Sequence, residues 1–199
     1  MKYLIFDTET VGFPISWTAP VTDTANWPQI VQLAWELYDA QGALLSSASD
    51  IIKPVGYHVP YESTRIHGIT HQQAVDEGRD VKEVLNTFVA VLSSDVVLVG
   101  HNVEFDYNVM GAELLREKIS SNFLDLPAIC TMRQSVGFCA LPGDKAPRLT
   151  ELYFKLFGDS FADAHNASAD VSATAKCFWE LKKRGVIKDP VVSSQGTLF

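Results

Sequence analysis

The chain has 199 residues, of which 47% are hydrophobic, so it is long enough to form one domain with a buried core. Its formal net charge of −8 argues against a protein that coats nucleic acid through a broad basic surface, but is compatible with a nuclease that binds its substrate in a local groove. The three cysteines lack the spacing of metal ligands, and no apolar run approaches the roughly 20 residues of a membrane helix, so we expect a reduced, cytoplasmic protein without a membrane span.

The N-terminal part of the chain favours strands. A short apolar run predicts a strand over residues 2–7, and β-branched and aromatic residues predict another over 29–39. Proline and glycine residues between 10 and 28 indicate a long connection. A turn at 40–42 leads into a third strand over 44–53, so the first three strands form an antiparallel meander.

Helices dominate the rest of the chain. Helical spacing of apolar residues predicts helices over residues 71–77, 80–92, 104–119, 147–157 and 166–184. A short apolar segment over 95–100 predicts a buried strand. This order predicts a mixed-sheet α/β domain over residues 1–187, followed by a flexible tail over 188–199.

Acidic residues stand in three separated segments, each beside a predicted strand end or helix start. Asp7 and Glu9 follow the first apolar run, while Asp106 and Asp170 lie in the first turns of two later helices. Residues i and i+2 of a strand point to the same face, so Asp7 and Glu9 can reach one site. Each segment alone has a simpler interpretation, because acidic residues are common in turns and are favoured at helix starts. Four carboxylates brought together would need divalent cations, and oxygen ligands suit Mg²⁺ or Mn²⁺.

Three motifs occur in a fixed order along the chain. They are Phe6-Asp7-Thr8-Glu9-Thr10, His101-Asn102-Val103-Glu104-Phe105-Asp106 and His165-Asn166-Ala167-Ser168-Ala169-Asp170. This conjunction resembles the DEDDh 3′–5′ exonucleases, a branch of the ribonuclease H-like superfamily, and within them the epsilon proofreading subunits of bacterial replicative DNA polymerases. The similarity covers roughly residues 1–184, and Val11 stands where a second threonine is usual in the family.

The resemblance implies a fold and a set of catalytic roles. The fold would be a ribonuclease H-like mixed sheet, with the first three strands antiparallel, further strands parallel, and helices on its flanks. Asp7, Glu9, Asp106 and Asp170 would hold two divalent cations, Mg²⁺ or Mn²⁺. His165 would accept the proton of the water that attacks the phosphorus. The products would be nucleoside 5′-monophosphates, released from the 3′ end of a single strand that is DNA rather than RNA.

Further residues are expected beside the terminal nucleotide. They are Thr8, Thr10, Phe13, Ile66, His67 and Asn102. Phe13 and Ile66 have core packing as an equal alternative, and His101 and Asn102 can instead hold the turn before the helix that carries Asp106. We interpret the four tryptophans as core or loop anchors rather than as platforms for bases, because their spacing forms no stripe.

The tail carries a short motif of its own. The segment Gln195-Gly196-Thr197-Leu198-Phe199 follows a stretch with proline and serine residues. It resembles the Gln-x-x-Leu-Phe peptide by which bacterial replication and repair proteins bind the sliding clamp, with Gln195, Leu198 and Phe199 as the contact residues. The alternative is an unstructured end with two chance apolar residues.

The sequence predicts a metal-dependent 3′–5′ exonuclease that acts on single-stranded DNA ends in proofreading or repair, with a replicative polymerase subunit as an expected partner. Two alternatives stay open. One is a 3′–5′ exoribonuclease resembling ribonuclease T or oligoribonuclease. The other is a catalytically idle module that binds a clamp or a polymerase, against which the complete set of four acids and one histidine argues.

Overall fold

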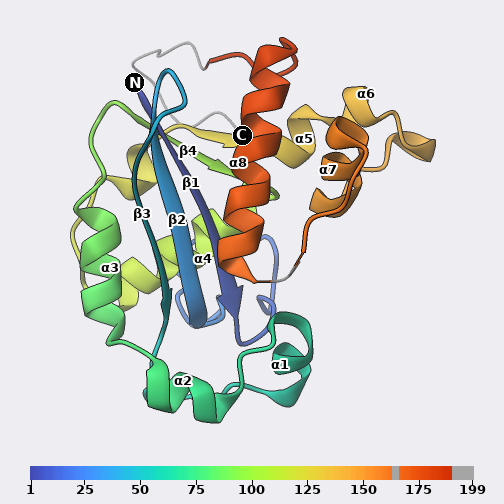
Figure 1. Cartoon of the computed structure of the whole chain (residues 1–199). Coiled ribbons are helices and arrows are strands. Elements are labelled where there is room, and N and C mark those ends of the chain that lie inside the picture. Colours follow the sequence, from blue (N-terminus) through green and yellow to red (C-terminus); the bar gives the residue numbers. More distant parts are fainter. Residues whose placement is uncertain (163–165, 190–199) are drawn as a thin grey trace.

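The computed structural model describes residues 1–162 and 166–189 (Figure 1). Strands β1 (Lys2–Thr10), β2 (Ile30–Asp39), β3 (Leu44–Ile51), β4 (Val96–Gly100) and β5 (Ala128–Cys130) form one five-stranded sheet in the order β3-β2-β1-β4-β5. The pairs β1–β2 and β2–β3 are antiparallel, and the pairs β1–β4 and β4–β5 are parallel. The predicted mixed sheet is therefore confirmed.

Helices cover both faces of the sheet and one of its ends. They are α1 (Tyr61–His67), α2 (His71–Glu77), α3 (Val81–Val89), α4 (Val103–Arg116), α5 (Thr131–Gln134), α6 (Val136–Cys139), α7 (Leu149–Phe157) and α8 (Ala167–Lys183). Helix α8 lies along one face of the sheet, α4 lies behind the sheet, and α3 lies beside β3 (Figure 1). Helices α1 and α2 lie near the end at which β1 finishes. Within the described residues, no helix combines the length and the apolar character needed to span a membrane.

The alternation of side chains along β1 divides the core into two layers. Leu4 and Phe6 pack with apolar residues of α3 and α4 in one cluster. Tyr3 and Ile5 point to the opposite face and pack with apolar residues of α7 and α8 in a second cluster. The two acidic residues of β1 occupy the next two odd-numbered positions, so they continue the face that α8 covers.

Several predicted boundaries differ from those of the structure. Strand β1 continues to Thr10 rather than ending at Asp7, because its pairing with β2 extends that far. Strand β5 and the helices α5 and α6 were not predicted, since each has only three or four residues. Helix α1 was not predicted either, because its sequence, YESTRIH, contains no helical spacing of apolar residues. The predicted long connection is confirmed as the β1–β2 loop, residues 11–29.

Buried hydrogen bonds give the β1–β2 loop a defined path. The Asn26 side chain is buried, and its carbonyl oxygen accepts a hydrogen bond from the Ser16 N–H at 2.7 Å. Its amide group donates to the Ser16 carbonyl oxygen at 2.9 Å. Both hydrogen-bonding functions of this buried amide are thus satisfied by one loop residue, which fixes the backbone there.

Helix α4 holds the same loop in place. The guanidinium of Arg116 donates to the carbonyl oxygens of Thr24 and Trp27. A Cβ atom built on Gly111 would lie 2.6 Å from a methyl carbon of Val21, so the absence of a side chain at Gly111 leaves the space that Val21 fills. The loop is therefore docked onto α4 by hydrogen bonds and by shape.

We expect Arg116→Met to destabilise the protein by about 3–5 kcal/mol, because the Glu113 carboxylate, 4% exposed and paired with Arg116, would stay buried without its partner. Urea unfolding monitored by circular dichroism measures the difference. The matched control is Arg133→Met, which removes the exposed ion pair with Glu104 and should cost less than about 1 kcal/mol. Equal losses in the two variants would contradict a structural role for the buried pair.

Candidate functional site

Three carboxylates meet at the end of β1. Asp7, Glu9 and Asp170 each offer an oxygen atom that lies within 4.8 Å of the other two. Asp7 and Glu9 share the face of β1 that α8 covers, and Asp170 lies in the first turn of α8. The start of α8 is fixed by Asn166, whose side-chain oxygen accepts hydrogen bonds from two backbone N–H groups of the first turn. We call Asp7, Glu9 and Asp170 the carboxylate cluster.

Asp106 approaches this cluster from the other layer of the core. It is 4% exposed, and its Oδ1 atom accepts hydrogen bonds from the Thr8 N–H at 2.9 Å and from the Thr8 hydroxyl at 2.6 Å. Strand β1 pairs with β4 only from Lys2 to Ile5, so beyond Ile5 this edge of β1 is open. The first turn of α4 occupies that edge. The Thr8 N–H therefore donates to the Asp106 side chain, in place of the backbone carbonyl of a neighbouring strand.

Burial and mutual repulsion keep protons on these carboxylates. Burial, and then the charges of Asp106, Glu9 and Asp170, raise the pKa of Asp7 well above its usual range. Burial, followed by the charge of Asp170 and then of Asp106, raises the pKa of Glu9 to about 8. Burial raises the pKa of Asp106 to about 7, although the hydrogen bonds from Thr8 act in the opposite direction. A hard divalent cation would remove the repulsion and prefers oxygen ligands, so this donor set fits such an ion.

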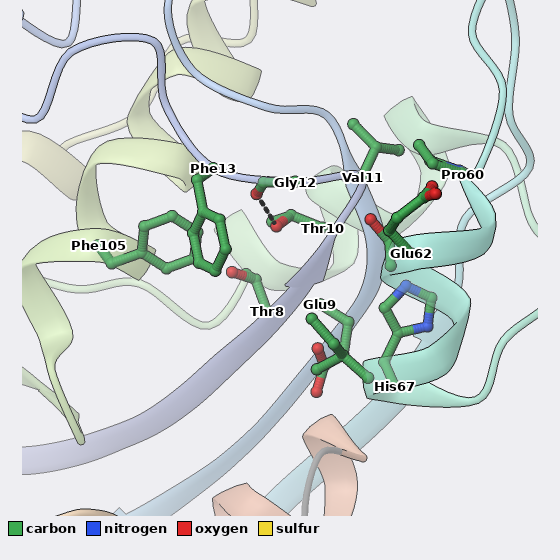
Figure 2. A pocket seen from close by; sticks show the side chains of 12 residues that line it. Thr8, Glu9, Thr10, Val11, Gly12, Phe13, Pro60, Glu62, His67 and Phe105 are labelled. Atoms are coloured by element: carbon green, nitrogen blue, oxygen red, sulfur yellow. Dashed lines mark hydrogen bonds between the residues drawn. The ribbon is translucent and has the colours of Figure 1, made fainter.

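A pocket of about 270 Å³ adjoins the cluster at Glu9. Figure 2 shows Phe13 and Phe105 together at one end of the pocket, with their ring centroids 6.5 Å apart. His67 of α1 and Pro60 lie at the opposite end, and Glu9 lies between the two ends (Figure 2). The pocket therefore has an aromatic wall and a second wall formed by α1, with a carboxylate of the cluster exposed to its interior.

Most of the predicted substrate residues line this pocket. They are Thr8, Thr10, Phe13, Ile66 and His67. Phe13 and Ile66 are exposed, so the alternative of core packing is wrong for both. The Thr10 hydroxyl donates to the Gly12 carbonyl oxygen at 2.7 Å and shapes the turn after β1. Asn102 lies elsewhere, at the N-terminus of α4 with φ of 70°, where it lines a separate cavity of about 130 Å³ and makes no side-chain cap.

His67 carries an unpaired donor. Its Nδ1 atom accepts a hydrogen bond from the Ile69 N–H at 3.1 Å, so the neutral ring holds its proton on Nε2. Burial lowers the pKa of His67, which favours this neutral form. The Nε2 atom is buried and has no hydrogen-bond partner among the described residues. Leaving such a group unpaired costs about 1–3 kcal/mol, so a ligand that accepts from Nε2 would gain affinity.

The predictions for the two histidines of the ordered motifs, His101 and His165, have different outcomes. His101 is structural: its Nε2–H donates to the Pro147 carbonyl oxygen at 3.0 Å, its Nδ1 lies 3.0 Å from the Thr131 hydroxyl, and burial lowers its pKa to about 4. His165 lies outside the described residues, so its role as general base stays a prediction. The same holds for the clamp-binding residues Gln195, Leu198 and Phe199.

Some residues of the site were not assigned from the sequence. Phe105 belonged to a motif but received no role, and Glu62 lies on α1, which gave no clear helical pattern. Trp17 is 58% exposed, so it does not belong to the core, and its ring contacts that of Phe105 on α4. The only signal for Trp17 was its place in the loop that follows Phe13.

Together, the mixed sheet and the acidic site fit an exonuclease, the class of enzyme that the sequence predicted. Residues 4–178 match the RNase_T family model, which is described as exonuclease. The chain therefore belongs to this family of DEDD-type 3′–5′ exonucleases, which are phosphodiester hydrolases that depend on divalent metal ions.

Relatives of known sequence include large replication proteins. The PolC-type DNA polymerase III of Latilactobacillus sakei is 29% identical over 182 residues, which cover 92% of this chain and 11% of the polymerase. The PolC-type DNA polymerase III of Streptococcus pneumoniae is 27% identical over 175 residues, which cover 87% of this chain and 11% of the polymerase. The chain thus spans about a tenth of the length of these relatives.

Solved structures with the same fold include exonuclease I from two bacteria. The zinc-bound complex of E. coli exonuclease I with single-stranded DNA has a TM-score of 0.75 at 23% identity, over 92% of this chain and 40% of that chain. Exonuclease I of Methylocaldum szegediense has a TM-score of 0.69 at 21% identity, over 92% of this chain and 40% of that chain. At these identities the likeness establishes the fold.

In the metal-free protein, we expect the free energy of unfolding to fall as the pH rises from about 5 to about 8. The folded pKa values of Glu9 and Asp106, about 8 and about 7, lie above the unfolded values of roughly 4, so the folded state holds more protons. The stabilisation present at low pH is lost as the pH passes through the folded values, by on the order of 1 kcal/mol per pH unit. Urea unfolding in EDTA across this range measures it.

Mg²⁺ should offset this loss at about pH 8 and raise the melting temperature, because an ion that binds only the folded state stabilises it. Glu9→Gln, which removes one titrating group and one ligand, should flatten the pH dependence and weaken the response to Mg²⁺. A metal-free stability that increases with pH over the same range would contradict the electrostatic account of the cluster.

Proposed function

We propose that the protein is a 3′–5′ exonuclease that hydrolyses single-stranded DNA ends to nucleoside 5′-monophosphates, in proofreading or repair. The observation that carries this proposal is the convergence of Asp7, Glu9 and Asp170 beside a pocket with an aromatic wall. The similar proteins, a DNA polymerase III and an exonuclease I in complex with single-stranded DNA, favour DNA over RNA as the substrate. A replicative polymerase is the corresponding partner.

The acidic residues would hold two divalent cations, Mg²⁺ or Mn²⁺. Asp7, Glu9, Asp106 and Asp170 supply only carboxylate oxygens, which are the ligands that these ions prefer. Both hydrogen bonds from Thr8 end on Oδ1 of Asp106, so they orient this carboxylate before any ion binds. When bound, two such ions provide Lewis-acid stabilisation of the attacking and leaving oxygens of an in-line displacement.

The protein side chains would then position the strand and move one proton. The terminal base would lie against Phe13, with Ile66 at the opposite wall, and the buried Nε2–H of His67 would donate to an oxygen of the nucleotide. Thr8, Thr10 and Asn102 are the further proposed contacts. His165 directly precedes Asn166, the residue that caps α8. As general base, His165 would take the proton from the attacking water.

The test is release of mononucleotides from labelled single strands of matched DNA and RNA, with Mg²⁺, Mn²⁺ or EDTA. Asp7→Ala and Asp170→Ala should each lose roughly 10³-fold or more in turnover, because each removes a cation ligand. Asp76→Ala, which removes an exposed carboxylate of α2, is the matched control and should retain wild-type turnover.

Three other outcomes would favour an alternative function or reject the proposed site. Faster hydrolysis of RNA than of DNA would favour the exoribonuclease alternative. No mononucleotide from either strand in the presence of metal would favour the idle binding module. Wild-type turnover in Asp7→Ala would reject the proposed roles of the carboxylates.

We also propose that the segment after Asp189, whose carboxylate accepts hydrogen bonds from Tyr3 and Lys182, binds a bacterial sliding clamp through Gln195, Leu198 and Phe199. The motif itself supports this proposal, since its two apolar side chains suit a hydrophobic pocket and its glutamine suits directional hydrogen bonds. Tethering would raise the local concentration of the enzyme at a primer end without changing its chemistry. A short peptide orders on binding, so its affinity should be modest.

Deleting residues 195–199 should leave the hydrolysis of free oligonucleotides unchanged and abolish binding to a purified bacterial clamp in calorimetry. The double variant Leu198→Ala/Phe199→Ala should reproduce the loss of binding in a chain of full length. The same clamp affinity with and without these residues, or none with either, would reject the tail as a clamp ligand.

A further inference from the structure

Three aromatic rings from two elements meet beside the pocket. Phe13 and Trp17 belong to the β1–β2 loop, and Phe105 belongs to α4. The ring centroids of Phe13 and Trp17 are 6.1 Å apart, and those of Trp17 and Phe105 are 5.8 Å apart. We call these three residues the aromatic platform. Phe13 and Phe105 line the pocket beside Glu9, while Trp17 lines the neighbouring cavity, so the platform extends from the pocket to the outer surface.

Burial in the core does not account for the position of Trp17. Its side chain is 58% exposed and that of Phe13 is 71% exposed, so neither residue contributes much burial to the core. Trp27 and Trp35 are both buried, which is the usual arrangement for this residue.

The backbone beside Trp17 is nevertheless held in place. The preceding residue, Ser16, is bonded through both its N–H and its carbonyl oxygen to the buried side chain of Asn26. A large ring is therefore kept at the surface, next to the pocket, by bonds that do not involve the ring itself. Such pre-organisation lowers the entropy lost when a ligand stacks on it.

The net charge of the protein favours bases over phosphates as the groups that the platform binds. A chain with a net charge of −8 gains little general attraction for phosphates, so its affinity for a strand must come from other contacts. Stacking of a base on an aromatic side chain is worth about 1–3 kcal/mol and depends little on the base. Three contacting rings that begin in the pocket offer such a surface for the part of the strand outside it.

We propose that Trp17, supported by Phe13 and Phe105, stacks with the base that precedes the terminal nucleotide of a single strand. The inference rests on the proposed exonuclease function, because that function places the terminal nucleotide in the pocket. It assigns to Trp17 a role in binding the strand and no part in the chemical step. The platform thereby selects unpaired ends at least two nucleotides long.

The experiment compares the affinity of Trp17 variants for a fluorescently labelled oligothymidylate of ten nucleotides. Anisotropy in Ca²⁺ measures the dissociation constant, and steady-state hydrolysis in Mg²⁺ separates KM from kcat. Trp17→Ala should raise the dissociation constant and KM by roughly 5- to 150-fold with little change in kcat, and Trp17→Phe should recover most of the affinity. The matched control is Ile15→Ala, which removes an 86% exposed apolar side chain of the same loop and should bind like the wild type.

A second substrate separates this inference from the function on which it rests. A nitrophenyl ester of thymidine 5′-monophosphate offers one nucleotide, so Trp17→Ala should lower the efficiency ratio of oligonucleotide to ester. Wild-type affinity for the oligonucleotide in a folded Trp17→Ala protein, with the wild type active, overturns the platform and leaves the exonuclease intact. Binding that depends on Trp17 in a wild type that hydrolyses neither substrate overturns the exonuclease and leaves the platform intact.

Discussion

Beyond Ile5, strand β1 is paired with β2 alone, and this half-open strand organises the site. Its open edge leaves the Thr8 N–H for Asp106, which brings a carboxylate from the layer of α4. Its alternation directs Asp7 and Glu9 to the face of α8, where they meet Asp170. One strand therefore joins carboxylates from both helical layers, and the acids converge although they belong to three distant segments.

The convergence has an energetic cost that a cation can offset. Carboxylates that are removed from solvent and repel one another stay partly protonated in the absence of metal, as the raised pKa values of Glu9 and Asp106 indicate. The same charges that weaken the metal-free fold at neutral pH create the affinity for a divalent ion. Binding of the ion would thus link the stability of the fold to the formation of the site. Functional sites often carry local features that destabilise the fold.

Local patterns predicted the parts of the fold that depend on one segment at a time. The bounds of α2 agree with the prediction, and the shared face of Asp7 and Glu9 follows from the period of a strand. Helix α1 gave no clear signal because it is mostly exposed and has few apolar residues, although it forms a wall of the pocket. The ring contacts of Trp17 depend on the path of a long loop, and that path is set by Asn26 of the loop itself and by Arg116, which lies 92 residues beyond Thr24. No local period encodes contacts of this kind.

The β1–β2 loop is fastened to α4, through Arg116 and the gap at Gly111, and its two ends join it to β1, which carries Asp7 and Glu9, and to β2. A substitution or an insertion near its tip changes neither the register of β1 on β2 nor the capping of α8. Mutation can consequently alter how the outer part of a strand is gripped while the metal ligands remain in place. Related proteins can therefore differ in the nucleic-acid ends that they bind and still share the same catalytic residues.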